Sequence, residues 1–173
     1  MSQTDSRGPR SSLLMSVEDL ASALRPSAGG PQGEAGLVVV DCRFNLLKPE
    51  AGRAAWLEGH IPGAFYADLN QDLSSPPRPD TGRHPLPDPE QLRTLLGGFG
   101  IGKATRVVAY DEGGGGLAAR LWWLLRWMGH GPVVLLDGGF AAWQKAGLPV
   151  DREEPALRPR RFEGRPGQMP VCD

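Results

Sequence analysis

The segment Thr105–His130 constrains the fold of this chain more than any other. It begins with the β-forming residues Arg106–Tyr110, continues through the glycine-rich run Asp111–Gly116 and ends in the apolar stretch Leu117–Met128. Four consecutive glycines cannot continue a strand, because glycine packs no side chain and loses the most backbone entropy on ordering. The segment therefore predicts a strand, a glycine loop and a helix. Since apolar residues lie on nearly every face of that helix, we expect it to pack against a sheet.

A glycine loop of this kind is a potential anion-binding cradle, because the first N–H groups of the helix point back into it. A Gly-x-Gly-x-x-Ala pattern over 113–118 also fits the dinucleotide-binding fingerprint, with Asp137 as the candidate ribose-binding acid. Against dinucleotide binding, Asp111 and Glu112 would place two negative charges beside a pyrophosphate, and four glycines in a row satisfy many glycine patterns by chance. A phosphate-binding P-loop is weaker still, because no Gly-Lys-Ser/Thr follows.

The length, charge and apolar runs of the chain exclude several classes of protein. Its 173 residues suffice for one domain with a full core. A formal net charge of −1 gives no electrostatic reason to expect nucleic acid or a membrane as a partner. No apolar run approaches the roughly 18 residues of a membrane span, and Leu13–Met15 is too short for the core of a signal peptide. We therefore expect a cytoplasmic protein.

The two cysteines, Cys42 and Cys172, are too few for a disulfide framework or a zinc site. Cys42 follows an apolar run, so we expect a small core residue rather than a reactive thiol. Cys172 has no neighbour that would activate it. The sequence thus predicts no metal site and no obvious cysteine nucleophile.

Apolar runs and helical patterns alternate along the chain. The capping-box-like pair Ser16 and Asp19, and the N-cap pattern of Asp88 with Pro89, mark two helix starts. Unbroken apolar strands between helices are typical of a parallel sheet buried on both faces, so we predict a three-layer α/β/α domain with a mainly parallel central sheet. The predicted strands span 37–40, 65–67, 106–110 and 133–137, and the predicted helices start after Ser16 and span 54–57, 89–99, 117–128 and 140–146.

Composition divides the chain further. Residues 1–12 are polar and turn-rich, and we expect them to be disordered. The folded domain is expected over 13–150, with a flexible loop at 26–36 that is rich in Gly and Pro. Over 151–173 prolines and charges dominate and no periodicity survives, which predicts a linker.

Four segments resemble the rhodanese family of thiosulfate and 3-mercaptopyruvate sulfurtransferases in order and spacing. They are VVVDCR (38–43), GHIPGAFYADL (59–69), the central strand, loop and helix (107–130), and VVLLDGGFAAWQKAGLPV (133–150). GRHPLPDP (82–89) is similar to the bacterial two-domain members. The resemblance implies a rhodanese-like domain that corresponds to the amino-terminal, non-catalytic half of such an enzyme. Residues 151–173 would then lead toward a missing second domain.

In active rhodaneses, the resemblance implies, a cysteine follows the central strand, and loop N–H groups stabilise its thiolate and persulfide. Here that position holds a carboxylate, which cannot form a persulfide. The family therefore implies a degenerate active-site loop and a chain that is inactive by itself, with no metal or organic cofactor. The loop consists of Asp111, Glu112, Gly113, Gly114, Gly115 and Gly116.

The same resemblance implies which partners the chain would have. They are a catalytic rhodanese domain that carries the active cysteine, or a second copy of this chain, together with small sulfur-donor anions. The alternative is a stand-alone inactive rhodanese module that acts as a binding or regulatory domain. A domain without its partner should expose an apolar patch and tend to dimerise, whereas an evolved single domain should be monodisperse.

His60 resembles a histidine placed near the domain cleft of mercaptopyruvate-type enzymes as a helper in catalysis. The simpler interpretation, which we favour, is that His60 bonds to backbone and orders the turn Ile61–Gly63. The acidic residue that accompanies this histidine in the mercaptopyruvate subfamily has no match, because Ala51 stands at its position. The substitution favours thiosulfate-type specificity.

Arg120 and Arg126 interrupt the apolar pattern of the central helix. Both are candidate substrate-cleft residues that would attract an anionic sulfur donor. A structural role is favoured for each, either in an ion pair with a strand-end acid such as Asp41 or Asp137, or at a solvent-facing edge.

Overall fold

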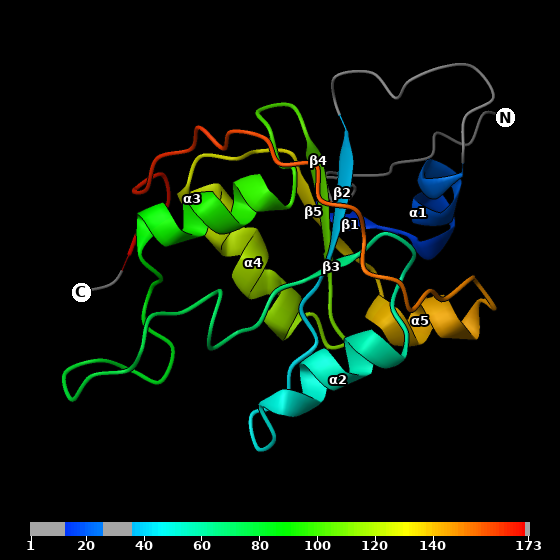
Figure 1. The fold of residues 1–173 in the computed structure, drawn as a ribbon, viewed down its shortest axis with the longest axis horizontal. Coiled ribbons are helices and arrows are strands. Elements are labelled where there is room, and N and C mark those ends of the chain that lie inside the picture. The colour runs from blue at the N-terminus through cyan, green and yellow to red at the C-terminus, as the bar shows by residue number, and fades with distance from the viewer. Residues whose placement is uncertain (1–12, 26–35, 172–173) are drawn as a thin grey trace, which may run out of the picture.

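The computed structural model describes residues 13–25 and 36–171. The expectations for residues 1–12, for 26–35 of the predicted loop and for Cys172 lie outside these ranges. The described residues form a five-stranded, all-parallel sheet in the order β1-β5-β4-β2-β3 (Figure 1). The strands are β1 (Leu14–Met15), β2 (Leu37–Asp41), β3 (Phe65–Tyr66), β4 (Arg106–Tyr110) and β5 (Val133–Leu136).

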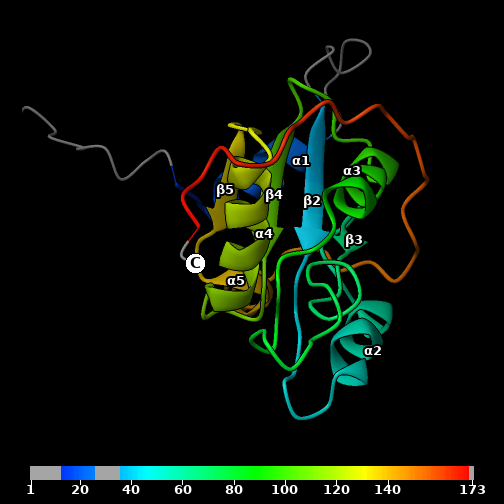
Figure 2. The same cartoon turned by 90° about the vertical axis from the view of Figure 1, so that its left-hand side faces the viewer.

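The sheet is covered on both faces, which confirms the predicted α/β/α layers. Helices α3 and α4 lie on one face, α1 and α5 lie on the other, and α2 lies beyond the carboxyl ends of the strands (Figures 1 and 2). None of the helices in the described ranges is long and apolar enough to cross a membrane. The helices are α1 (Val17–Leu24), α2 (Glu50–Glu58), α3 (Pro89–Gly98), α4 (Gly116–Trp127) and α5 (Gly139–Lys145).

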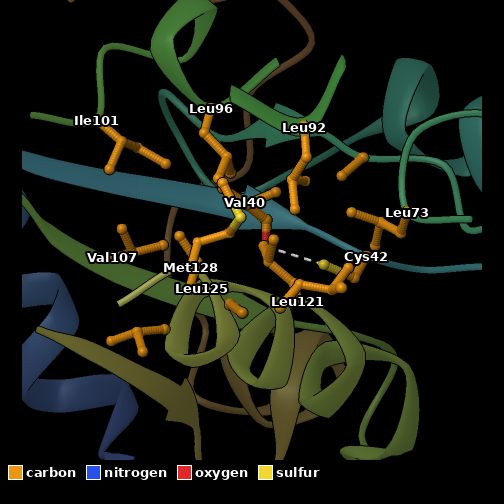
Figure 3. Close-up of a cluster of buried hydrophobic side chains, with 14 of the residues drawn as sticks. Val40, Cys42, Leu73, Leu92, Leu96, Ile101, Val107, Leu121, Leu125 and Met128 are labelled. Carbon is orange, nitrogen blue, oxygen red and sulfur yellow. Dashed lines mark hydrogen bonds between the residues drawn. The ribbon is translucent and has the colours of Figure 1, made fainter. Parts of the chain in front are cut away.

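The two central strands supply both halves of the core, because successive side chains point to opposite faces. Val38 and Val40 pack into the cluster beneath α3 and α4. Val39 packs into the cluster beneath α1 and α5. Leu121 of α4 and Leu92 of α3 are fully buried in the first cluster, as Figure 3 shows. The continuous apolar runs of the sequence are thus explained by burial on both faces.

Helix starts follow the predicted capping chemistry. The Ser16 hydroxyl accepts a bond of 3.1 Å from the Asp19 N–H at the start of α1. At the start of α3, the Asp88 carboxylate accepts 3.0 Å bonds from the N–H groups of Glu90 and Gln91. These side chains satisfy N–H groups that have no partner within the helix, which fixes where each helix begins.

Helix α2 is longer than the predicted span 54–57 because tertiary packing overrides a weak local signal. Gly52 lowers the helix propensity of its first turns. A Cβ atom at Gly52 would nevertheless clash with the Arg43 carbonyl and the Tyr66 hydroxyl. The position therefore needs glycine for a close approach to the chain after β2, and the helix forms around that contact.

The proline-rich segment after α5 packs along the domain. The backbone of Asp151 pairs with that of His60 in an antiparallel bridge. Farther on, the Arg160 N–H donates to the Gly97 carbonyl at 2.9 Å, and the Gln168 N–H donates to the Trp127 carbonyl at 3.0 Å. Phe162 is only 6% exposed and joins the core cluster of α3 and α4. Figure 2 shows the segment passing from the α2 end of the molecule to α4.

Candidate functional site

The candidate site is the loop between β4 and α4. Strand β4 ends at Tyr110, and the chain then turns through Asp111–Gly114 to the helix N-cap at Gly115. Gly115 has a φ of 80°, a left-handed conformation that favours glycine over any residue with a Cβ. The turn directs the first N–H groups of α4 back toward the end of β4, as the sequence predicts.

The Asp111 carboxylate occupies the resulting cradle. Oδ1 accepts hydrogen bonds from the N–H groups of Gly113 and Gly115, and Oδ2 accepts from those of Leu117 and Ala118. All four nitrogen-to-oxygen distances are 3.0 Å, and Asp111 is 3% exposed. A negative charge at the N-terminus of a helix is favourable, and each bond to it is charge-assisted. The four N–H groups thus surround an anion, and this anion is the Asp111 carboxylate of the chain itself.

The loop is fastened to α5 by main-chain bonds. The Phe140 N–H donates to the Asp111 carbonyl at 2.8 Å, and the Ala141 N–H donates to the Glu112 carbonyl at 2.9 Å. Gly139 lies so close to the Asp111 carbonyl that a Cβ atom would clash there. The close approach explains a glycine at this position, and it holds both carbonyl groups of the Asp-Glu pair away from the cradle.

A buried polar network lies next to the cradle and was not predicted. The Arg43 guanidinium bonds both oxygens of the Asp41 carboxylate and also donates to the Gly59 carbonyl. The Cζ atom of the Arg43 guanidinium lies 4.0 Å from the centre of the Phe140 ring. The Tyr110 hydroxyl donates to Asp41 at 2.8 Å. The network ties the chain after β2 to the last residue of β4, directly before Asp111.

The ionisation of this network is set by burial and pairing. Burial raises the pKa of Tyr110, and the neighbouring Asp41 charge raises it further. Burial alone would lower the pKa of Arg43, but the hydrogen bonds and charge of Asp41 outweigh it and raise this pKa. The phenol therefore stays neutral and the guanidinium stays charged. An acid at a strand end with an arginine two residues later, as in VVVDCR, is the sequence signal that could have revealed the pair.

His60 is fully buried and does not open onto the cradle. Its Nδ1 lies 2.7 Å from the Trp56 carbonyl oxygen, and its Nε2 lies 2.9 Å from that of Glu153. Its ring also stacks on the Trp56 indole at 4.8 Å. Both ring nitrogens are engaged with backbone, in keeping with the favoured structural interpretation. The bond to Glu153 fastens the segment after α5 to the GHIPG turn.

The two arginines of α4 lie in different surroundings. The Arg120 guanidinium donates to the carbonyl groups of Leu73, His84 and Pro85, so it holds the proline-rich loop against the helix. Burial lowers the pKa of Arg120. Arg126 is exposed near the other end of α4, 5.8 Å from the centre of the Trp122 ring. Asp41 pairs with Arg43, so neither arginine forms the suggested ion pair with it. The exposed position of Arg126 agrees with the alternative of a solvent-facing edge.

Cys42 lies in the core, as its place after an apolar run predicts. Figure 3 shows it among the apolar side chains beneath α4, with its sulfur directed to the Val40 carbonyl at 4.0 Å. Burial raises the pKa of the Cys42 thiol, and the charges of Asp41 and Asp111 raise it further. The thiol is therefore protonated and unreactive. Within residues 13–25 and 36–171, no cluster of three or more His, Cys, Asp or Glu side chains could hold a metal ion.

Comparison with protein families and curated proteins identifies the family of this chain and several relatives. The model of the rhodanese-like domain matches residues 27–146. A probable 3-mercaptopyruvate sulfurtransferase of Pseudomonas aeruginosa is 48% identical over 165 residues, which cover 94% of this chain and 55% of that protein. Human 3-mercaptopyruvate sulfurtransferase is 39% identical over 157 residues, which cover 86% and 49%. The chain thus spans about half the length of these relatives.

Solved structures share the fold. The 3-mercaptopyruvate sulfurtransferase of Leishmania major superposes with a TM-score of 0.74 at 26% identity, over 93% of this chain and 42% of that one. SseA of Escherichia coli superposes with a TM-score of 0.73 at 28% identity, over 92% and 56%. The matched region again amounts to about half of each solved chain.

Proposed function

Because the chain belongs to the rhodanese-like domain family, we propose that it is the amino-terminal, non-catalytic domain of a thiosulfate or 3-mercaptopyruvate sulfurtransferase. It would form one wall of the active-site cleft and an interface with a second rhodanese domain that carries the catalytic cysteine. The curated relatives named above are sulfurtransferases about half of whose length this chain spans, which supports a protein of two such domains. A cytoplasmic location stays a prediction.

The proposed inactivity follows from the chemistry available at residue 111. In the thiosulfate reaction, a cysteine thiolate attacks the outer sulfur, the S–S bond breaks, and sulfite leaves with the bonding electron pair. The resulting cysteine persulfide then gives its outer sulfur to cyanide, which forms thiocyanate and restores the thiolate. A carboxylate has no sulfur atom to extend in this way. With Asp111 in place of the cysteine, the thiosulfate reaction would therefore stop before its first step.

One observation carries the proposal: the four N–H groups that an active loop would offer to a persulfide all bond to the Asp111 carboxylate. A second anion would have to displace a charge that is covalently attached and already saturated with donors. The cysteine nearest in sequence to the site's polar network, Cys42, is buried in the core beneath α4. The chain's own residues thus support a scaffold role rather than a nucleophilic one.

The surface at the same edge of the sheet supports an interface. Leu46 and Leu47 lie in the loop between β2 and α2 and are 62% and 92% exposed. Because the strands are all parallel, this loop and the loop after β4 lie at the same edge of the sheet (Figure 1). Adjacent exposed leucines at the sheet edge that also carries the degenerate cradle suit a surface that a second domain covers.

Thiocyanate formation from thiosulfate and cyanide tests the proposed inactivity. We expect no turnover by the purified chain or by its Cys42→Ala and Cys172→Ala variants. Turnover that disappears in one cysteine variant would refute the assignment and identify that cysteine as the nucleophile.

Sedimentation velocity separates the proposal from the alternative of a stand-alone binding or regulatory module. A domain that lacks its partner should self-associate through its exposed apolar surface, and Leu47→Ser should weaken that association. A chain that is monodisperse at every concentration favours the stand-alone module.

A further inference from the structure

A groove whose lining includes none of the cradle residues carries an inference that is independent of sulfur transfer. It has a volume of about 930 Å³ and lies between α3 and the segment 159–165. Its charged lining residues are Glu90, Arg93, Arg160, Arg161, Glu163 and Arg165. Four arginines against two glutamates make the groove positive, whereas the chain as a whole has a formal net charge of −1. We propose that this groove binds an acidic peptide segment of a partner protein.

The groove is built by specific contacts rather than by a loose tail. The Phe162 ring is buried in the core, and the Arg93 guanidinium donates to the Gly164 carbonyl at 2.8 Å. Gly97 allows the segment to approach α3 closely, because a Cβ atom there would clash with the Arg160 carbonyl. The backbone that presents the arginines is therefore held on both sides of Phe162.

Two of the guanidinium groups are available to a ligand. Within the part of the chain that the structure describes, the side chains of Arg161 and Arg165 have no hydrogen-bond or ion-pair partner, and both residues are exposed. Arg93, by contrast, is paired with Glu90. A guanidinium binds a carboxylate through two parallel hydrogen bonds, so exposed and unpaired arginines in a groove suit an acidic ligand.

The residues that line the groove favour a peptide over a nucleic acid. Proteins that bind single-stranded nucleic acids combine a positive groove with exposed aromatic rings on which bases stack. The aromatic residue that lines this groove, Phe162, has its ring buried in the core. Glu90 and Glu163 would also repel a continuous row of phosphates. An extended peptide can place its carboxylates at the arginines and neutral residues beside the two glutamates.

Fluorescence anisotropy with a labelled oligoglutamate peptide tests this assignment. We expect saturable binding that weakens about tenfold in the double variant Arg161→Ala/Arg165→Ala, since two exposed ion pairs are lost. The matched control is Arg78→Ala/Arg83→Ala, which makes the same change in net charge at exposed positions of the proline-rich loop. Urea midpoints equal to that of the parent chain would show that both variants fold.

Three results would overturn the proposal. The first is no binding of oligoglutamate, and the second is equal weakening in the two double variants, which would indicate net charge rather than the groove. The third is tighter binding of a single-stranded oligonucleotide or of inorganic polyphosphate than of oligoglutamate, lost in the Arg161→Ala/Arg165→Ala variant. That result would assign the groove to a phosphate-bearing partner.

Discussion

Replacing Asp111 by asparagine should destabilise the domain strongly although the two side chains have nearly the same shape. The amide oxygen can still accept from one pair of the four loop N–H groups. The amide nitrogen then points its hydrogens at the other pair, and the negative charge at the start of α4 is lost. Hydrogen bonds to a charged group contribute about 1.5–3 kcal/mol each, and an N-cap contributes about 0.5–2 kcal/mol.

Two mismatched donors and the lost charge, partly relieved by water at the exposed glycines, give a loss of about 2–4 kcal/mol in the free energy of unfolding. Urea denaturation measures this loss. With a slope near 2 kcal/mol per molar urea, which is typical of small domains, the midpoint should fall by about 1–2 M. Glu112→Gln is the matched control, because it removes the same charge from an exposed neighbour and should shift stability by less than about 0.5 kcal/mol. A loss below about 1 kcal/mol for Asp111→Asn would refute the claim that the carboxylate fills a donor-lined cradle.

Three further changes follow from burial. In a Cys172→Ser background, Cys42 should resist alkylation in the folded chain and react once urea unfolds it, because burial raises its thiol pKa; rapid labelling without urea would contradict this. Phe162→Ala should lower stability by about 3–5 kcal/mol, whereas Leu157→Ala, at a position 71% exposed, should change it by less than about 0.5 kcal/mol. Equal urea midpoints for these two variants would show that the segment after α5 is not part of the folded unit. Burial lowers the pKa of His130 below its unfolded value, although the bond to the Thr105 carbonyl opposes the shift. The unfolded chain therefore binds more protons, and stability should rise with pH up to about 6.5. The His130→Gln variant should show a smaller rise of the urea midpoint between about pH 5 and 7. The same rise in the variant as in the parent chain would show that His130 does not cause the pH dependence.

Local signals in the sequence were sufficient for the central part of the fold. The β-forming run and the glycine stop define β4 and its loop, and the apolar stretch defines α4 to within one residue at each end. The capping residues Ser16 and Asp88 likewise mark where α1 and α3 begin. Each of these features depends on residues that are neighbours in the chain.

Features that depend on distant residues were not predictable in the same way. Strand β1 has two residues, too few for any periodicity, and it forms because Leu14 and Met15 pair with β5. The partners of Arg120 lie 35–47 residues away in the sequence, which no local pattern indicates. The glycine run predicts a loop between β4 and α4, but the acceptance of all four N–H groups by the Asp111 carboxylate depends on how that loop folds back over the end of β4.

If Asp111 fills the cradle as proposed, this domain cannot accept sulfane sulfur. Intact-mass measurement of the purified chain after incubation with thiosulfate detects such an acceptance, because a persulfide adds the mass of one sulfur atom. We predict an unchanged mass. A gain of one sulfur that cyanide removes would refute the proposed inactivity, since it would show a working nucleophile in a chain whose cradle is filled by Asp111.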